Sequence, residues 1–166
     1  RAKYTFDVQH GGIADLVPNT RFQVISLMDV IEHLTDPLED LRHLRRLVAP
    51  DGFLVVSTMD SDSLTCRLLG KRLEDFRRVR EHLYFFSRNT IRDALAATGW
   101  RLVGIESLGH TFRVSMLIDR IELVSPLLGK TLRFFVRPRW LLQANFYVNP
   151  RTKILIWAVP SAPDSV

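Results

Sequence analysis

Two histidines that each directly follow a glutamate are the residues of this chain best suited to acid–base chemistry. Glu32-His33 stands just after an apolar run, and Glu81-His82 ends the most basic stretch of the sequence. Histidine accepts protons near neutral pH because its ordinary pKa is about 6.5, and a positioned base assists transfer of a chemical group onto a hydroxyl or amine. His82 is therefore the first candidate for a general base and His33 the second, with an orienting or structural role open for each.

The stretch from Phe22 to Pro37 positions the first of these pairs. Phe22–Leu27 is apolar and rich in β-branched and aromatic side chains, which predicts a short buried strand. Asp29 and Glu32-His33 follow at once, and ligands of open α/β sheets bind beyond the carboxyl ends of the strands. We therefore expect this segment to form an edge of the functional site.

A helix and a second strand follow and complete a strand–helix–strand unit. Asp36 suits the N-cap and Pro37 the first helical position, and leucines recur on one stripe as far as Leu47. Pro50-Asp51-Gly52 predicts a turn, and Phe53–Thr58 is the nearly continuous apolar run expected of a buried parallel strand. The pattern predicts an α/β fold with a right-handed crossover.

The rest of the chain predicts another helix and strand and then a helical region. Ser87 and Gly99 suit the two ends of a helix, and a strand is expected from Trp100 to Leu108. Apolar residues then recur at helical spacing from residue 114, followed by mixed aromatic and basic residues up to Trp140. We expect a helical insertion at about residues 110–150, before a last apolar strand over Lys153–Val159.

Three ordered motifs in these segments resemble those of one enzyme family. Residues 27–34, LMDVIEHL, followed by Asp36-Pro37, resemble the fourth-strand motif of class I S-adenosylmethionine-dependent methyltransferases. The similarity is closest to the branch that contains the ubiquinone-pathway O-methyltransferases. Residues 49–58 look like the next turn and strand of that family, and residues 81–87 look like a further segment. The resemblance covers roughly residues 4 to 108.

The resemblance implies a Rossmann-like sheet, mostly parallel with an antiparallel last strand, and S-adenosylmethionine as the cofactor. It also implies that the adenine of the cofactor lies near Gly12, Ile13 and Ala14. The methionine or ribose part of the cofactor is expected near Leu27 and Met28. Asp29 is also counted among the expected cofactor-binding residues, where it would fix the loop after the strand. An ordinary Gly-Gly turn is the alternative interpretation of the first of these segments.

The same resemblance predicts elements upstream of the segments found here. The family's first strand, its Gly-rich loop and its second strand should precede Tyr4, and the sequence starts at Arg1. We therefore expect residues 1–160 to form a partial methyltransferase domain that lacks the first two strands, as the C-terminal part of a longer enzyme, followed by a frayed tail at 161–166. Such a chain is expected to bind S-adenosylmethionine poorly by itself.

Charge and apolar patterning narrow the expected partners. The formal net charge of +5 favours phosphates, nucleic acid or anionic lipid only weakly. Nucleic acid is not expected. A nucleic-acid methyltransferase would need a groove with stacking aromatics interleaved with basic residues, and Asn-Pro-Pro-Tyr-type acceptor motifs are absent from the sequence. Residues 110–140 predict either a lid or a peripheral membrane contact. No apolar run approaches the roughly 20 residues needed to span a bilayer.

The sequence as a whole predicts methyl transfer to a small-molecule acceptor, more readily at oxygen. One cysteine, Cys66, excludes an internal disulfide and a cysteine-based zinc site and fits a cytoplasmic location. No metal is expected, although Glu32-His33 resembles part of the Glu-Glu-His arrangement of some relatives. The alternatives are a degenerate, non-catalytic scaffold of the same fold and a nucleic-acid methyltransferase; the acceptor and the oligomeric state stay open.

Overall fold

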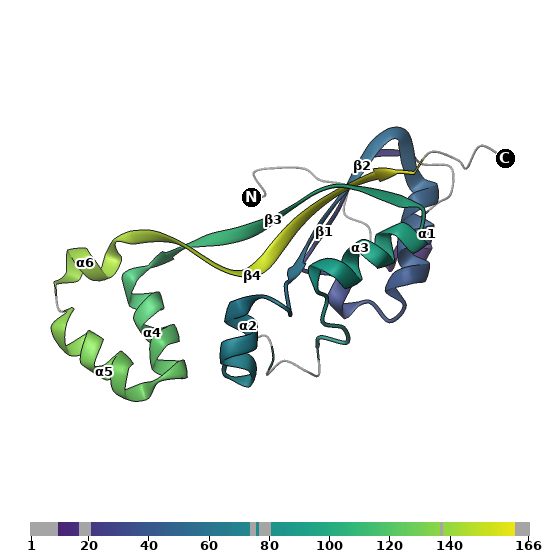
Figure 1. The fold of residues 1–166 in the computed structure, drawn as a ribbon. Coiled ribbons are helices and arrows are strands. Elements are labelled where there is room, and N and C mark those ends of the chain that lie inside the picture. The colour runs from purple at the N-terminus through teal and green to yellow at the C-terminus, as the bar shows by residue number, and fades with distance from the viewer. Residues whose placement is uncertain (1–9, 17–20, 74–75, 77–80, 137, 162–166) are drawn as a thin grey trace.

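A four-stranded sheet forms the centre of the molecule (Figure 1). The computed structural model describes residues 10–16, 21–73, 76, 81–136 and 138–161, so the strand expected at residues 4–8 lies outside the described residues. The strands occur in the order β1-β2-β4-β3 and are β1 (Phe22–Met28), β2 (Val48–Met59), β3 (Trp100–Arg113) and β4 (Asn145–Pro160). β1 and β2 are parallel, and β4 is antiparallel to both of its neighbours. The predicted α/β sheet, mostly parallel with an antiparallel last strand, is confirmed.

Two helices, α1 (Pro37–Leu47) and α3 (Arg88–Ala97), cover one face of this sheet (Figure 1). α1 begins where the sequence predicts, because the carboxylate of Asp36 accepts a hydrogen bond from the backbone N–H of Glu39 at 3.0 Å. The apolar stripe of α1 packs into the core through Leu41, Leu44 and Leu47. Trp100 is fully buried beside it and donates its indole N–H to the carbonyl of Leu41 at 3.0 Å.

The two faces of the sheet differ in burial. Side chains alternate along each strand, and Leu54 and Val56 of β2 point into the core with 0% of their surface exposed. On the other face, Val24 and Phe53 are register neighbours that remain 51% and 38% exposed, and Met28 is 50% exposed. We call the surface defined by Val24, Met28 and Phe53 the open face.

β2 begins earlier than the sequence indicated, at Val48 instead of Phe53. The register with β1 shifts between Phe22, which pairs with Val48, and Val24, which pairs with Phe53. β2 thus advances five residues where β1 advances two, so the predicted turn around Gly52 is present as a wide bulge within the strand. Glycine is required there, because an added Cβ would lie 2.8 Å from the carbonyl oxygen of Gln23. An apolar run marks the regular part of a strand and does not reveal such a bulge.

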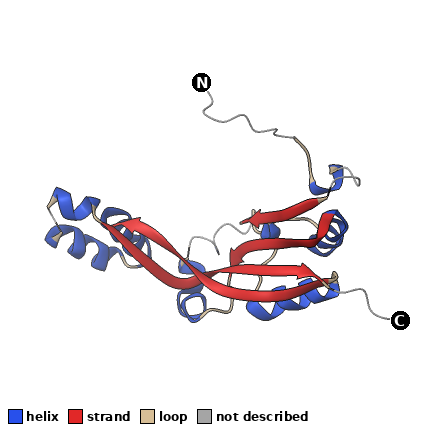
Figure 2. Ribbon diagram, turned by 90° about the horizontal axis from the view of Figure 1, so that it is seen from above, coloured by secondary structure: helices blue, strands red, loops and turns tan. Residues whose placement is uncertain are grey.

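β3 and β4 are also longer than predicted, at 14 and 16 residues. Their paired ends leave the sheet as a two-stranded ribbon (Figure 2). The ribbon carries three helices, α4 (Val114–Val124), α5 (Pro126–Phe135) and α6 (Arg139–Gln143). We call residues 109–149, which form the ribbon end and these helices, the arm, and the rest of the described chain the body. The arm extends away from the sheet in both ribbon views (Figures 1 and 2).

The arm is held together by a close helix contact and one ion-pair group. Gly129 of α5 is buried against α4, where an added Cβ would overlap the backbone of Glu122. The guanidinium of Arg133 binds the carboxylates of Asp119 at 2.5 Å and Glu122 at 3.0 Å. Ile118 is the only apolar side chain of the described arm that is buried. The arm therefore has very little core of its own.

A short helix, α2 (Leu64–Leu69), and the single turn η3 (Gly70–Arg72) follow β2 and lie between the sheet and the arm (Figure 1). The hydroxyl of Ser63 accepts a hydrogen bond from the backbone N–H of Cys66 at 3.3 Å, which caps α2. The hydroxyl of Thr65 donates to the carbonyl of Pro150 at 2.6 Å. This bond ties α2 to β4 at the point where the arm begins.

Candidate functional site

A polar cluster on the open face marks the carboxyl end of β1. The backbone N–H of Asp29 donates to the carbonyl of Ser57 at 3.0 Å and to its hydroxyl at 3.1 Å, and that hydroxyl donates to the Asp29 carboxylate at 3.1 Å. Lys153 of β4 forms an ion pair with the same carboxylate. Asp29 has a φ of 54°, a left-handed conformation that aspartate tolerates better than most residues. The strand therefore ends in a fixed turn at Asp29.

A second cluster, of Glu32, His33 and His82, lies beyond the same strand ends. The single turn η2 (Ile31–His33) follows β1, and Glu32 within it is buried. The Glu32 carboxylate accepts a hydrogen bond from the Thr58 hydroxyl at 3.0 Å. The backbone carbonyl of Glu32 accepts hydrogen bonds from the backbone N–H groups of Leu83 at 2.8 Å and Tyr84 at 3.2 Å. These bonds hold the segment after residue 80 against η2.

The two histidines chosen from the sequence are therefore neighbours in space. Their ring centroids are 4.8 Å apart in an edge-on arrangement, and His82 is only 9% exposed. Nδ1 of His33 lies 2.6 Å from the carbonyl oxygen of Glu81. Because a carbonyl can only accept, Nδ1 of His33 must carry a proton, which leaves Nε2 as the basic nitrogen of the neutral ring.

This cluster has two chemical uses. A pair of neutral imidazoles can take a proton from a hydroxyl held nearby. A ligand atom from each of Glu32, His33 and His82 also lies within 4.8 Å of the other two, a donor set of carboxylate and imidazole that suits divalent metals. The sequence suggested only Glu32-His33 for such a role, because His82 reaches it through the chain's tertiary fold.

The residues expected to contact the cofactor lie in two separate places. Met28 is half exposed on the open face, next to the fixed turn at Asp29, whereas the side chain of Leu27 is buried in the core and only its backbone faces the strand end. The other three, Gly12, Ile13 and Ala14, are at the single turn η1 (Ile13–Asp15) and its N-cap. Figure 2 shows η1 beside the start of β1, and it contacts α1. The structure does not bring these two groups together.

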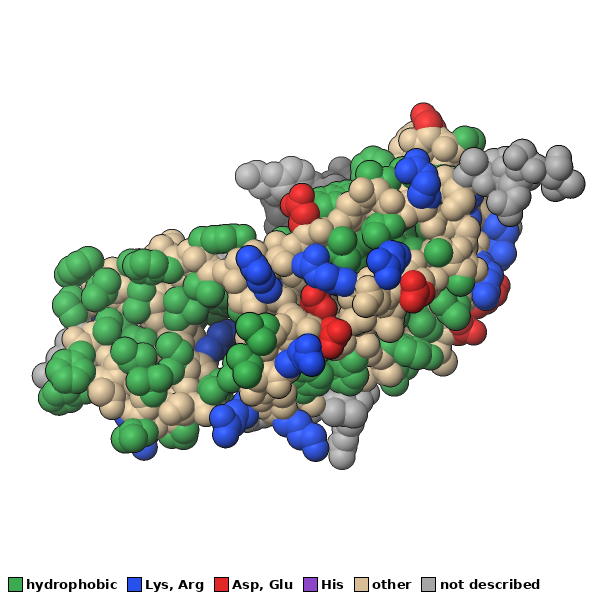
Figure 3. All heavy atoms as spheres, in the orientation of Figure 1, with side chains coloured by type: hydrophobic (Ala, Val, Ile, Leu, Met, Phe, Trp, Pro, Cys, Tyr) green, Lys and Arg blue, Asp and Glu red, His purple; other side chains and the backbone are tan. Residues whose placement is uncertain are grey.

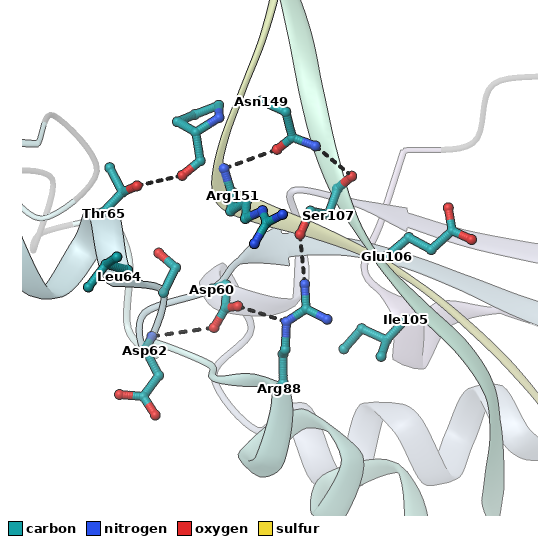
Figure 4. Close-up of a pocket in the computed structure, with 12 residues that line it drawn as sticks. Asp60, Asp62, Leu64, Thr65, Arg88, Ile105, Glu106, Ser107, Asn149 and Arg151 are labelled. Carbon is teal, nitrogen blue, oxygen red and sulfur yellow. Dashed lines mark hydrogen bonds and ion pairs between the residues drawn. The ribbon is translucent and has the colours of Figure 1, made fainter.

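A polar hollow of about 840 Å³ opens beyond the carboxyl end of β2 (Figure 4). Arg88, at the start of α3, donates to the Asp60 carboxylate at 3.0 Å and to the Ser107 hydroxyl at 2.7 Å. Arg151 enters the hollow from β4 (Figure 4), and its backbone N–H donates to the Asn149 side chain at 3.0 Å. We call this space the polar hollow.

The sequence did not single out several of these polar residues. Ser57, Thr58 and Asp60 could have been noticed, because they stand at the carboxyl end of an apolar strand, the position at which α/β sheets carry ligand groups. Lys153 and Arg88 gave no local signal. Their partners, Asp29 and Asp60, belong to other elements, and only the order of the strands brings them together.

Comparison with known proteins gives one family match. The model of the methyltransferase domain family matches residues 2–105. Among curated proteins, the ubiquinone biosynthesis O-methyltransferase of Actinobacillus pleuropneumoniae serotype 7 is 36% identical over 62 residues, which cover 34% of this chain and 26% of that protein. The matched segment thus spans about a quarter of that relative.

Solved structures share the fold at low sequence identity. A SAM-dependent methyltransferase from Thermotoga maritima is 16% identical with a TM-score of 0.54, over 91% of this chain and 62% of its own. The [4+2]-cyclase SpnF is 13% identical with a TM-score of 0.54, over 93% of this chain and 57% of its own. Two such different reactions on one fold mean that the reaction must be argued from the site.

Proposed function

Because the chain belongs to the methyltransferase domain family, whose model matches residues 2–105, we propose that it transfers a methyl group from S-adenosylmethionine to a small-molecule acceptor, at oxygen. The family resemblance inferred from the sequence is confirmed by this match. The choice of oxygen depends on one observation, the pairing of His33 and His82 at the end of β1. A hydroxyl must lose a proton when it is methylated, so the site needs a base.

Met28 and the turn at Asp29 are suited to one flank of the cofactor. The exposed thioether chain of Met28 offers an apolar surface at the carboxyl end of β1, where α/β sheets bind ligands. The Asp29 carboxylate is already engaged by Ser57 and Lys153, so its part is to hold the turn. S-adenosylmethionine, when bound, supplies an electrophilic methyl group. The chain's own task is to orient the acceptor and remove its proton.

His82 is the residue best placed to act as that base. The nearby carboxylates are less available, since Glu32 accepts a hydrogen bond from Thr58 and Asp29 is paired with Lys153. The edge-on contact and the Glu81 carbonyl fix the ring of His33, which suits it to orient His82. Partial burial of His82 limits its contact with bulk water. These contacts support the assignment of His82 as base and His33 as its partner.

The test is methyl transfer from tritium-labelled S-adenosylmethionine to a panel of small hydroxyl, amine and thiol compounds. His82→Ala should lower turnover with the best hydroxyl acceptor by roughly 10². His43→Ala is the matched control, because His43 lies on α1 away from these clusters, and it should leave turnover unchanged. Equal turnover in the two variants, or transfer only to nitrogen, would contradict the proposal. Absence of transfer to every compound, although S-adenosylmethionine is bound, would favour the non-catalytic scaffold.

A divalent cation on Glu32, His33 and His82 is a second role for the same residues, favoured by the closeness of their ligand atoms. Chelation separates the two roles. If the side chains act through a cation, EDTA should abolish turnover and Mg²⁺ or Zn²⁺ should restore it. If His82 is the base alone, turnover should be unaffected by EDTA.

The arm supplies the surface for the expected peripheral contact with lipid. Large apolar side chains gather on it in Figure 3, and five exposed aromatic residues lie along its helices and ribbon: Phe134, Phe135, Trp140, Phe146 and Tyr147. Residues 110–150 contain six Arg or Lys and two Asp or Glu. Exposed aromatics with an excess of basic residues suit an anionic lipid surface. None of the described helices is long and apolar enough to cross a membrane.

Co-sedimentation with vesicles tests this contact. The chain should sediment with phosphatidylserine-containing vesicles and less with phosphatidylcholine alone, and Trp140→Ser should weaken the binding. Val103→Ser is the matched control, because Val103 is a similarly exposed apolar residue of the body. Equal binding to charged and uncharged vesicles, or equal effects of Trp140→Ser and Val103→Ser, would contradict the proposed lipid contact. Self-association through the arm in the absence of vesicles would assign the surface to a second copy.

A further inference from the structure

A second, apolar hollow of about 420 Å³ lies between α2 and the arm. Leu69 and Leu73 form one wall, and the other comes from α4 and α5 through Leu117, Ile121 and Leu128. Its volume falls within the range of roughly 300–1,000 Å³ seen for small-molecule sites. Leu128 is 52% exposed, so apolar surface of this wall is open to a ligand.

The apolar hollow adjoins the polar hollow. Thr65 and Pro150 line both spaces, and the hydrogen bond between the Thr65 hydroxyl and the Pro150 carbonyl forms their common wall. A ligand with one polar and one apolar end could therefore occupy both at once. Its polar end would contact the polar hollow, and its apolar end would contact the apolar hollow.

The charges around the polar hollow indicate the kind of head group. Arg88 is already bound by Asp60 and Ser107, and the lining holds Arg151 together with two further acidic residues, Asp62 and Glu106. An anionic head would meet these carboxylates, and a cationic head would meet Arg151. An uncharged head with several hydroxyls can donate to the carboxylates and accept from the guanidinium.

We propose that the two hollows together bind an amphiphile with an uncharged, hydroxyl-rich head in the polar hollow and a single apolar chain in the apolar hollow. The role of this amphiphile as the methyl acceptor rests on the proposed function, since its hydroxyls would be the groups that receive the methyl. The binding itself does not depend on methyl transfer. It follows from the pairing of the two spaces at Thr65 and Pro150.

Chain length and head charge are the two properties that the experiment varies. Isothermal titration calorimetry of the full chain, without methyl donor, would compare hexyl and octyl glucoside below their micellar concentrations. Each methylene buried should tighten binding about fourfold, so octyl glucoside should bind roughly fifteenfold more tightly than hexyl glucoside. Nonanoate and octyltrimethylammonium carry the same octyl chain on charged heads and should both bind at least tenfold more weakly than octyl glucoside.

Neighbouring leucines of α2 provide matched variants. Leu69→Trp should fill the apolar hollow and abolish the gain in affinity from hexyl to octyl glucoside. Leu69→Ala should reduce that gain, because it removes apolar contacts. Leu68→Trp is the control, because Leu68 is 73% exposed and lines neither hollow. Arg151→Ala should weaken octyl glucoside severalfold and leave the chain-length ratio intact. Circular dichroism would show that each variant keeps its helices.

The outcomes separate this site from the proposed function. Equal affinities for hexyl and octyl glucoside, equal affinities for the three heads, or equal effects of Leu69→Trp and Leu68→Trp would overturn the amphiphile site. Octyl glucoside that binds as expected and receives no methyl group would support the site and contradict its role as the methyl acceptor. Transfer to small water-soluble hydroxyl compounds without any glucoside binding would support the function and overturn the site.

Discussion

The body and the arm use apolar residues in opposite ways. In the body, leucines and isoleucines from α1, α3 and the sheet form one continuous buried core. In the described arm only Ile118 is buried among the apolar side chains, and residues such as Leu127 and Trp140 are 81% and 73% exposed. Burial of apolar surface is the main favourable term in folding. The body therefore has a core that stabilises it, whereas the described arm leaves most of its apolar surface exposed.

Helix capping follows the same division. The three α-helices of the described body each begin at a residue whose side chain caps the helix, at Asp36, Ser63 and Ser87. The helices of the arm begin at Arg113, Ser125 and Pro138, and none of these makes a side-chain cap bond. The arm helices thus depend more on their ribbon, on Gly129 and on the Arg133 ion pairs.

The largest expected difference between the regions is the cost of truncating a leucine. Leu41→Ala should lower the free energy of unfolding by about 2–5 kcal/mol, because Leu41 has 0% exposure in the core. Leu127→Ala, at an exposed residue of the arm, should change the free energy of unfolding by no more than about 0.5 kcal/mol. Urea unfolding of both variants measures these values. Similar losses would show that the arm has a core as important as that of the body.

A substitution at Gly129 should act on the arm alone. Gly129→Ala places a methyl group against the backbone of Glu122, which cannot move aside as a flexible side chain could. We expect a local cost of about 1–3 kcal/mol, seen as faster amide hydrogen exchange in α4 and α5 with α1 unchanged. Lys130→Ala, at the next and exposed position, is the control and should leave exchange as it is. Faster exchange throughout the body would contradict the independence of the two regions.

A smaller difference is expected at the helix starts. Asp36→Ala removes the cap of α1 and should cost about 1 kcal/mol. Ser125→Ala removes no cap bond, since the Ser125 side chain makes none to α5, and should cost clearly less. Thermal unfolding followed by circular dichroism compares the two. An equal loss would mean that the Ser125 hydroxyl supports α5 in a way that the structure does not show.

The body was the more predictable region from sequence, for a physical reason. The leucine stripe ending at Leu47, the cap at Asp36 and the apolar run of β2 are local signals of burial, and each lies where it was predicted. The start of β2 at Val48, before the bulge at Gly52, was not predicted, because a shift of register depends on the partner strand. The long ribbon was missed because its residues, such as Thr111 and Tyr147, pair with each other and are not buried.

The candidate site was predictable only in part. His33 and His82 were selected by their type and position, and the structure places them in contact. Lys153 and Arg88 were missed, since ion pairs between distant elements leave no trace in sequence spacing. The expected cofactor contacts at Ile13 and Met28 stay predictions, and in this structure they lie at different ends of β1.

The most direct test of the central claim is ultraviolet cross-linking of tritium-labelled S-adenosylmethionine, followed by tryptic peptide mapping. Trypsin separates the two expected contact regions, since residues 22–42 form one peptide and residues 4–21 another. We predict label in the peptide of residues 22–42, reduced by Met28→Ala and unaffected by Met116→Ala, a methionine of the arm with similar exposure. Label confined to other peptides, or equal effects of the two substitutions, would contradict a cofactor site at the carboxyl end of β1.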